Sequence, residues 1–309
     1  MDLDARRLKV LHEVSLRGSV TAAAAVLYIS PSAVSQQLAL LAKEAGCELV
    51  ARNGRGVVLT PAGEVLARHA AAILASLDRA AAAVAAASQQ VNGLVRVGSF
   101  PSAAGAVVAP AAAAAMAAEP SLDIRITESE DEPSLLDLRS GLLDVVLLQV
   151  YDHVPKPLPA DLDEHPLFTD PMFLLTPTSW GCTGSSLADL ADAVWVASYL
   201  STPCGQSTLQ ACRDVGFEPD IRHRAIDFGL TIEMVAAGLG AALIPSMALP
   251  VVPEAVRFCR LTDPETSRRI FAVTRAQGAG PLRPAISALL DEMRRVRVPA
   301  PPVREPAGS

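Results

Sequence analysis

The chain has few cysteines, and their placement excludes the classes of small protein that depend on them. The 309 residues contain five cysteines, at positions 47, 182, 204, 212 and 259, and no two of them form a Cys-x-x-Cys pair. An odd, scattered set of this kind is neither a disulfide framework nor a zinc finger.

Long hydrophobic runs suited to a membrane are also absent. Each long apolar stretch is rich in alanine or broken by charged residues or proline, whereas a membrane helix needs about 20 apolar residues. Asp2, Asp4 and Arg6 stand where a signal peptide would be apolar. Hydrophobic residues still make up 50% of the chain, which excludes wholesale disorder. We therefore expect a soluble, cytoplasmic protein of two or three domains with no membrane partner.

Known signatures of catalysis are missing as well. The sequence has no Gly-x-Ser-x-Gly, His-Glu-x-x-His or phosphate-loop pattern. Its five histidines are dispersed without metal-ligand spacing, so no metal is expected. Gly238 and Gly240 follow a predicted helix and precede a strand, the reverse of the order in a dinucleotide-binding loop. We expect neither enzyme activity nor a cofactor.

Charge is divided unevenly along the chain. The net charge is −7, but residues 1–91 carry nine Lys and Arg against seven Asp and Glu, which leaves −9 for the remainder. The negative total argues against a protein that coats nucleic acid with its whole surface. The asymmetry suggests two halves with different partners.

The first 60 residues contain three predicted helices. Residues 5–16 space leucine and valine as one packed helical face, and Gly18 ends that helix. Ser19 is placed to cap a short, alanine-rich second helix. Ser30 followed by Pro31 is typical of the start of a third.

The third helix has one apolar and one polar face. Val34, Leu38 and Leu41 are spaced as its buried stripe. A merely solvated opposite face would normally carry Lys and Glu. Here it carries short or amide side chains, namely Ser32, Ser35, Gln36 and Ala39. Such side chains suit hydrogen bonding to base edges in the DNA major groove, and the alternative is a small polar helix in a bundle.

Two short predicted strands follow, joined by a glycine-rich turn. Arg52 and Arg55 lie at the tip of this otherwise apolar hairpin, where they add little stability but are well placed to contact phosphates. Two helices, a turn, a third helix and a hairpin make a winged helix-turn-helix over residues 1–60.

Four runs of this segment match a known family pattern. They are Gly18-Ser19-Val20-Thr21-Ala22-Ala23, Ser30-Pro31-Ser32-Ala33-Val34-Ser35-Gln36-Gln37-Leu38, Leu49-Val50-Ala51-Arg52 and Leu59-Thr60-Pro61-Ala62-Gly63. Without an evident gap, residues 3–70 resemble the start of the LysR-type transcriptional regulators. The resemblance implies base-reading positions at Pro31, Ser32, Ser35 and Gln36, and phosphate-contacting positions at Thr21, Arg52 and Arg55. Many relatives carry Arg in place of Gln36; Arg favours guanine and Gln favours adenine, so the preferred half-site is expected to differ.

A long helix is predicted from Thr60-Pro61, with no glycine between Gly63 and Gly93. Its apolar residues recur at spacings of four and three, which is a heptad seam. The seam consists of Leu66, Ala70, Ile73, Leu77, Ala80, Val84, Ala87 and Val91. A single helix lying on its own domain is the alternative. The resemblance implies that residues 61–92 are a linker helix for dimerisation, which matches a DNA site of two half-sites.

From residue 93 onward, predicted strands and helices alternate, which indicates an α/β fold with a parallel sheet. Two runs resemble the family's effector domain, Leu138-Arg139-Ser140-Gly141-Leu142-Leu143-Asp144-Val145 and Val235-Ala236-Ala237-Gly238-Leu239-Gly240-Ala241-Ala242-Leu243-Ile244-Pro245. They imply a two-subdomain, periplasmic-binding-protein-like (type II) effector domain over residues 93–298. We expect subdomain I at 93–165 and 269–298, subdomain II at 166–268, and a disordered tail at 299–309.

Ligands of such sheets bind beyond the carboxyl ends of strands, against helix N-termini. Serines there could hold a carboxylate and aromatic rings an apolar group. The predicted effector-binding residues are Ser99, Phe100, Ser102, Glu128, Tyr151, Cys204 and Phe228. Each alone is as often a helix cap or a core residue. The acidic run 128–132 is interpreted as a solvated loop; if part of it faces the cleft, the effector would carry an amine.

The sequence thus predicts a regulator that binds double-stranded DNA, senses a small organic effector and forms a homodimer or homotetramer. RNA polymerase is a further partner if the protein is an activator. The alternative is a redox-sensing regulator, because peroxide-sensing relatives carry two reactive cysteines where this chain has Cys204 and Cys212. Against it, Arg213 is the one basic neighbour, and Cys212 lies on a helix among apolar residues.

Overall fold

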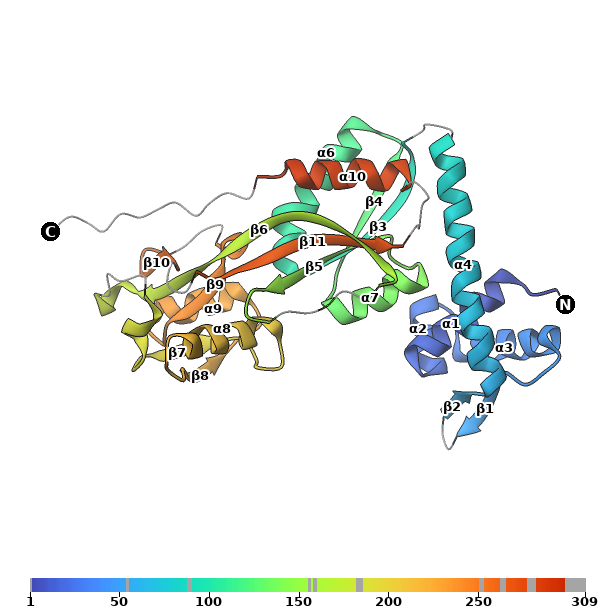
Figure 1. Cartoon of the computed structure of the whole chain (residues 1–309), viewed down its shortest axis with the longest axis horizontal. Coiled ribbons are helices and arrows are strands. Elements are labelled where there is room, and N and C mark those ends of the chain that lie inside the picture. Colours follow the sequence, from blue (N-terminus) through green and yellow to red (C-terminus); the bar gives the residue numbers. More distant parts are fainter. Residues whose placement is uncertain are drawn as a thin grey trace.

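The computed structural model describes residues 2–53, 56–87, 91–154, 157, 160–181, 186–249, 253–261, 265–276 and 282–297. They form a small head (residues 2–60), a long helix α4 (Pro61–Ala87) and a larger α/β domain. In Figure 1 the head lies beside the lower part of α4, and the α/β domain extends away from both.

Three helices and a hairpin build the head, as predicted. Its elements are α1 (Ala5–Arg17), α2 (Val20–Leu27), α3 (Pro31–Ala45) and the antiparallel strands β1 (Val50–Asn53) and β2 (Gly56–Leu59). The hydroxyl oxygens of Ser19 and Ser30 accept hydrogen bonds from backbone N–H groups in the first turns of α2 and α3. The predicted stripe of α3 is buried in the core of the head, so the caps and the periodicity together define this fold.

Helix α4 is fixed to the head at its start. The Thr60 hydroxyl accepts a hydrogen bond from the Gly63 N–H, which caps the helix. A Cβ on Gly63 would lie 2.0 Å from the carbonyl oxygen of Leu49, so only glycine fits this crossing. Ala70 is buried in the core of the head, so this member of the predicted seam packs within its own chain.

The α/β domain is built on a seven-stranded mixed sheet in the order β10-β6-β11-β5-β3-β4, with β9 also paired to β6. The strands are β3 (Gly93–Ser99), β4 (Leu122–Glu128), β5 (Val145–Tyr151), β6 (Leu162–Pro177), β9 (Ala242–Pro245), β10 (Val256–Arg260) and β11 (Ser267–Arg275). β3 runs parallel to β4 and β5, whereas β6, β9, β10 and β11 pair antiparallel. The expected parallel sheet is therefore one part of a mixed sheet.

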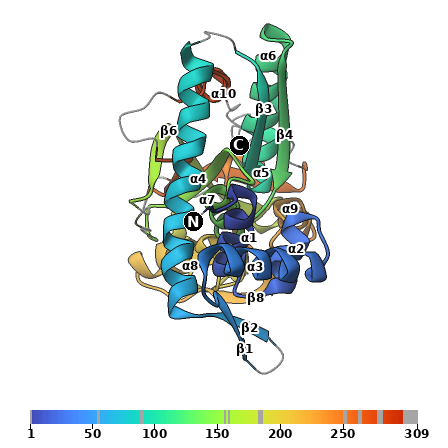
Figure 2. The same ribbon diagram turned by 90° about the vertical axis from the view of Figure 1, so that its right-hand side faces the viewer.

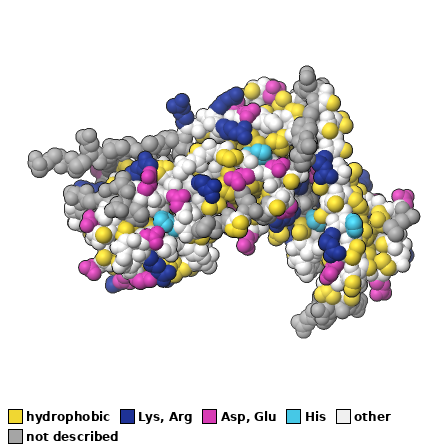
Figure 3. Space-filling model, in the orientation of Figure 1, with side chains coloured by type: hydrophobic (Ala, Val, Ile, Leu, Met, Phe, Trp, Pro, Cys, Tyr) yellow, Lys and Arg dark blue, Asp and Glu magenta, His cyan; other side chains and the backbone are white. Residues whose placement is uncertain are grey.

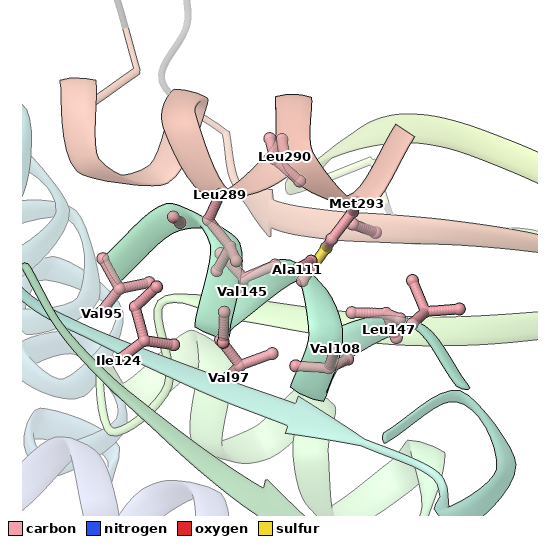
Figure 4. Close-up of a cluster of buried hydrophobic side chains, with 14 of the residues drawn as sticks. Val95, Val97, Val108, Ala111, Ile124, Val145, Leu147, Leu289, Leu290 and Met293 are labelled. Carbon is pink, nitrogen blue, oxygen red and sulfur yellow. The ribbon is translucent and has the colours of Figure 1, made fainter. Parts of the chain in front are cut away.

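Helices cover both faces of the first half of this sheet (Figure 2). On one face lie α5 (Pro101–Ala103), the π-helical turn η1 (Ala104–Val108), α6 (Ala109–Ala118) and α10 (Pro284–Arg295); on the other lies α7 (Asp131–Ser140). Figure 4 shows Val95, Val97, Ile124, Val145 and Leu147 of the strands meeting Val108, Ala111, Leu289, Leu290 and Met293 of the helices. This core fixes the helix starts that border the cleft described below.

The second half holds a smaller parallel pair and its own helices. These are β7 (Val194–Ala197) and β8 (Asp220–Arg224), α8 (Pro203–Asp214) and α9 (Phe228–Ala236), with short turns η2 (Thr178–Trp180), η3 (Leu187–Leu190) and η4 (Ser246–Ala248). β6 connects the halves: residues 162–171 pair with β11, and residues 172–177 pair with β9 and β10. The expected division at residues 165 and 166 falls inside this continuous strand.

Among the described helices, the segment Pro101–Ala118 is long and apolar enough to cross a membrane. In this structure its Val107, Val108 and Ala111 pack into the core against the sheet. The expected tail at residues 299–309 lies outside the described residues.

Candidate functional site

The outer face of α3 is polar and open. Ser32, Ser35 and Gln36 are exposed, while Val34 and Leu38 on the inner face are buried. The Ser35 hydroxyl donates to the backbone carbonyl of Pro31 at 3.0 Å, which leaves its lone pairs as acceptors. This face carries uncharged hydrogen-bonding groups, which suit contacts with base edges.

The other predicted DNA contacts surround α3 or lie outside the described part of the chain. Thr21 at the start of α2 and Pro31 at the start of α3 are exposed. The backbone of Arg52 lies in β1, paired with Val57, and its side chain is not described. Arg55 lies outside the described residues.

Tyr28, in the turn between α2 and α3, was not predicted as a site residue. It is the C-cap of α2, has a left-handed backbone (φ 54°) and is 93% exposed. Non-glycine residues rarely take this conformation, and a fully exposed tyrosine gains nothing from packing. It lies three residues before Pro31, the first residue of α3.

A cleft of about 1220 Å³ lies between the two halves of the α/β domain. Six of the seven predicted effector residues line it: Phe100, Ser102, Glu128, Tyr151, Cys204 and Phe228. Ser99 is not among the lining residues; it is fully buried, and its hydroxyl donates to the carbonyl of Phe100. The apolar wall includes Ile232, Met247 and Leu249.

A buried arginine occupies the floor of the cleft. The Nε of Arg268 donates to a carboxylate oxygen of Asp170 at 2.9 Å, and Nη2 lies 2.8 Å from the same oxygen. Nη2 donates to Ser102, and Nη1 donates to Gln149 and Tyr151. Each of the three guanidinium nitrogens thus has a hydrogen-bond partner, and both members of the ion pair are almost fully buried. Arg268 therefore joins parts of the protein here, with every nitrogen bonded before any ligand arrives.

This arginine joins the two halves of the domain. It stands at the start of β11, while Ser102 belongs to α5 and Asp170 to β6. Asp170 in turn accepts the backbone N–H of Met247 in the second half. The guanidinium also lies over the ring of Phe100, 5.3 Å from its centroid.

The rim of the cleft is acidic on balance, with three carboxylates against one guanidinium, that of Arg297. Glu128 at the end of β4 and Glu130 before α7 line the cleft and are exposed. Within the described part of the chain, neither carboxylate has a hydrogen bond or ion pair. The third rim carboxylate, Asp227, accepts the Leu230 N–H at 2.7 Å and so caps α9. Two unpaired carboxylates face the cleft, a placement that the sequence left open.

Burial disfavours thiolate formation at both candidate redox cysteines. Cys204, in the first turn of α8, has its pKa raised by burial, although Tyr151 and Arg268 act in the opposite direction. Burial also raises the pKa of Cys212, on the same helix, to about 12. The two lie eight residues apart, or about 12 Å along α8, whereas a disulfide needs Cα atoms within about 7 Å.

Sequence reasoning missed the floor of the cleft. In the sequence, Arg268 precedes another arginine and suggests the exposed end of a strand. It is nevertheless in phase with Ile270 and Ala272, which face the core. That period of two was the available signal. Its partner Asp170 gave no such signal, because a single Asp before Pro171 is typical of a turn. Across the described residues, no group of His, Cys, Asp and Glu could hold a metal ion.

Beyond the head, α4 exposes an apolar edge. Ile73, Leu77 and Val84, predicted as seam residues, are 39%, 51% and 72% exposed. Figure 3 shows hydrophobic side chains along this helix. At its lower end a shallow groove is lined by Leu3, Leu49, Val65, Leu66 and Ile73, among others.

Two family models match the chain. The model for the bacterial regulatory helix-turn-helix protein of the lysR family matches residues 5–64, and the LysR substrate binding domain matches residues 88–297. The nitrogen assimilation regulatory protein nac of Escherichia coli is 32% identical over 251 residues, covering 81% of this chain and 78% of that protein. A probable hydrogen peroxide-inducible genes activator of Mycobacterium avium is 29% identical over 281 residues, 87% of each chain.

Solved structures share the fold. A full-length OxyR variant from Pseudomonas aeruginosa has a TM-score of 0.66 at 20% identity, covering 96% of this chain and 99% of that one. Full-length CbnR in complex with its target DNA has a TM-score of 0.55 at 20% identity, covering 95% and 99%. With the helix-turn-helix and the effector domain both matched, the chain belongs to the LysR family of DNA-binding transcriptional regulators.

Proposed function

We propose that this regulator reads a two-part DNA site with helix α3 and responds to a small organic effector held in the cleft. The observation that carries the proposal is the outer face of α3, where Ser32, Ser35 and Gln36 are exposed and uncharged. Such a face has no advantage in water, but it matches the donors and acceptors of the major groove. The cleft, between the two halves of the α/β domain, supplies a separate place for a ligand.

Selection of genomic DNA tests this function. Purified full-length protein, at physiological salt, is used to recover fragments of the source genome for sequencing. We expect enrichment of an interrupted inverted repeat beside a few promoters, because a symmetric dimer reads two half-sites. Recovery independent of sequence would reduce the head to an electrostatic anchor and contradict the proposal.

The proposed effector carries a cationic amine and an apolar body. Glu128 and Glu130 offer unpaired carboxylates at the rim. Each guanidinium nitrogen of Arg268, in contrast, already has a hydrogen-bond partner within the protein. Phe228, Ile232 and neighbouring side chains give the cleft an apolar wall. Net negative charge at the rim and no free cation at the floor favour an ammonium group over a carboxylate.

Matched compounds test the effector class. A branched or aromatic amine, its N-acetyl derivative and the corresponding carboxylic acid are compared by their effect on the melting temperature. We expect the amine alone to stabilise the protein, and Glu128→Gln with Glu130→Gln to remove that effect. Stabilisation by the acid but not by the amine would contradict the assignment.

A second variant tests whether the ligand sits in the cleft. A Cβ on Gly105 would meet no atom within 4 Å, so Gly105→Phe projects a ring into open space at the cleft wall. We expect it to fold and to lose the amine response. Ala113→Phe, on the exposed side of α6, is the matched control and keeps the response.

The functional unit is proposed to be at least a homodimer joined through α4. The exposed Ile73, Leu77 and Val84 are spaced for a helix partner of the same kind, and a dimer or tetramer would bury them.

Effector binding would favour one closure of the cleft and so alter how paired α4 helices space the heads. A ligand that changes neither the DNA footprint nor the DNA bend contradicts this mechanism. The regulator acts in the cytoplasm, and RNA polymerase is its further partner if it activates transcription.

Peroxide sensing through Cys204 is the second candidate. The similarity to proteins named as probable hydrogen peroxide-inducible genes activators favours it, and Cys204 lines the cleft. The raised pKa values of both thiols and their separation along α8 oppose it. We expect peroxide to leave operator binding unchanged. A peroxide response that Cys204→Ser or Cys212→Ser removes without loss of folding would establish this candidate instead.

A further inference from the structure

The head touches the α/β domain of the same chain through helix α7. Arg17 of α1 forms an ion pair with Asp137 of α7, and its Nε lies 3.3 Å from a carboxylate oxygen of Glu13. The Glu13 side chain is fully buried and that of Arg17 is 12% exposed, so the contact is enclosed. Figures 1 and 2 both show α1 next to α7.

The same end of α7 is tied to the linker helix. Arg275 of β11 donates through Nη1 to the carbonyls of Leu138 and Leu143, at 2.6 and 2.8 Å. Its Nη2 lies 3.0 Å from a carboxylate oxygen of Asp78 in α4. The C-terminal end of α7 thus contacts α1 of the head directly and α4 through Arg275.

The other end of α7 lies at the cleft. Glu130, its N-cap residue, lines the cleft, and the helix of ten residues is about 15 Å long. Leu135 and Leu138 anchor it in a buried cluster with Val146 and Phe271. A helix packed in this way shifts as a unit, because a close-packed core transmits displacement and does not absorb it.

We propose that α7 is the relay that couples the effector cleft to the DNA-binding head of its own chain, through a releasable latch between α1 and α7. The proposal rests on the proposed function of the two sites. A ligand that displaces Glu130 would move Asp137 relative to Arg17. By reciprocity, DNA that repositions the head would change the cleft.

The contact between α1 and α7 contains a buried polar atom that favours its release. Glu13 Oε1 is buried at this interface with no hydrogen-bond partner among the described residues. Unpaired buried polar atoms weaken a docked arrangement, because water would satisfy them after release. The docked contact is therefore weaker than a fully hydrogen-bonded one, which lowers the cost of release.

Hydrogen exchange of the full-length protein tests the relay. We expect operator DNA, taken from the genomic selection, to change amide exchange at residues 128–135 by the cleft. In Asp137→Asn, which leaves the pair of Arg17 and Glu13 intact, that change should fall about twofold or more. Arg17→Asp should act in the same way, and the exchanged pair Arg17→Asp with Asp137→Arg should restore the response.

The matched control is Asp161→Asn. It removes the 2.8 Å ion pair of Arg139 with Asp161, which involves α7 but neither α1 nor α4, and should keep the response. Amide exchange is also measured without DNA. There, α1 and residues 128–135 should both exchange faster in Asp137→Asn than in wild type. Equal behaviour of Asp137→Asn and Asp161→Asn overturns the relay. Failure to recover any operator contradicts the proposed function, and the comparison without DNA then still decides the relay.

Discussion

Neighbouring polar side chains on α3 differ in the partners they already have. The Gln36 amide is exposed and has no hydrogen bond within the described part of the chain. The side-chain carbonyl oxygen of Gln37 accepts a hydrogen bond from Arg7 Nε at 3.3 Å, so this glutamine contributes to the packing of the head. Two adjacent glutamines therefore give a matched pair for separating base reading from stability.

Replacing Gln36 by Ala should relax recognition of one base pair. The loss of a bidentate amide contact costs about 1–3 kcal/mol of discrimination in favour of adenine at that position. Binding to the operator and to its single-base variants measures this. Gln37→Ala is the control and should leave base preference intact; equal losses on specific and random DNA in Gln36→Ala would contradict base reading by Gln36.

Arg52 should behave in the opposite way. Removal of a phosphate contact lowers affinity for all sequences and reduces the slope of log K against log salt by about 0.9. Affinities of Arg52→Ala for operator and random DNA, measured across a salt series, test this prediction. An unchanged salt slope would exclude Arg52 from the phosphate contacts.

Gly63 is fixed by contact and not by backbone angle. An added methyl group would overlap the Leu49 carbonyl oxygen, so Gly63→Ala should destabilise the head by about 1–3 kcal/mol. Urea unfolding followed by helix signal measures the change. Gly105→Ala is the counterpart: its Cβ meets nothing, and it should be neutral or stabilising by up to about 1 kcal/mol. Equal stability of wild type and Gly63→Ala would disprove the overlap.

At the scale of elements, α4 has two roles along its length. Its first turns complete the core of the head through Ala67 and Ala70. Its later turns expose Leu77 and Val84, which no described part of the chain covers. The predicted seam is thus divided between an internal contact and an apolar edge that a partner helix would cover.

A charge on that edge should separate the protomers. Leu77→Glu places a carboxylate where two α4 helices would meet, and we expect dissociation to monomers by analytical ultracentrifugation. Operator affinity should fall with it, because two linked heads bind more tightly than one. Arg79→Glu, on another side of α4, is the control and should remain oligomeric. A Leu77→Glu protein with wild-type mass would place the interface elsewhere.

Elements with local signals were predictable, and those set by distant contacts were not. Ser19, Ser30 and Thr60 cap helices that begin where expected, since capping depends on a few adjacent residues. Residues 172–175 alone have the local apolar pattern of a strand, whereas β6 spans Leu162–Pro177. Its first half has three consecutive polar residues, Asp163 to His165, and two prolines, so it lacks a local strand pattern, and pairing with β11 holds it extended. Register and pairing partners of this kind follow from tertiary contacts.

For the site, the helix starts were predictable and the floor was not. Phe100, Cys204 and Phe228 follow strands at the carboxyl edge, so topology brings them to one cleft. The partnership of Arg268 with Asp170 joins strands 98 residues apart in sequence, and no local pattern encodes that distance. The contact of α1 with α7 is of the same kind.

At the scale of the whole molecule, a buried histidine lies where the head meets the α/β domain. Burial lowers the pKa of His12 below its usual 6.5, and Lys9 acts in the same direction. Glu13 and the backbone of Arg139 oppose this shift, and Arg17 and Asp137 form the ion pair beside it. The ring is therefore neutral in the docked state near neutral pH.

Acidification should loosen this junction. The unfolded chain takes up the His12 proton near pH 6.5 and the folded chain only at lower pH, so stability is lost as the pH falls below about 6.5. Unfolding free energies at about pH 7.5 and about pH 5.5 measure the slope. His12→Gln should reduce it. His165, whose pKa burial also lowers, contributes separately, so His165→Gln is the parallel variant. Identical slopes for wild type and His12→Gln would remove His12 from the pH response.

The hydrogen-bonded arginine at the floor of the cleft bears on how such a regulator can change its ligand during evolution. Arg268 joins Ser102, Gln149, Tyr151 and Asp170 without needing any effector. Rim positions such as Glu128 and Glu130 bear no part of that network, so they are free to mutate while the domain keeps its shape. A duplicated copy could therefore acquire a new inducer through one or two substitutions at the rim, with its architecture and its operator inherited unchanged.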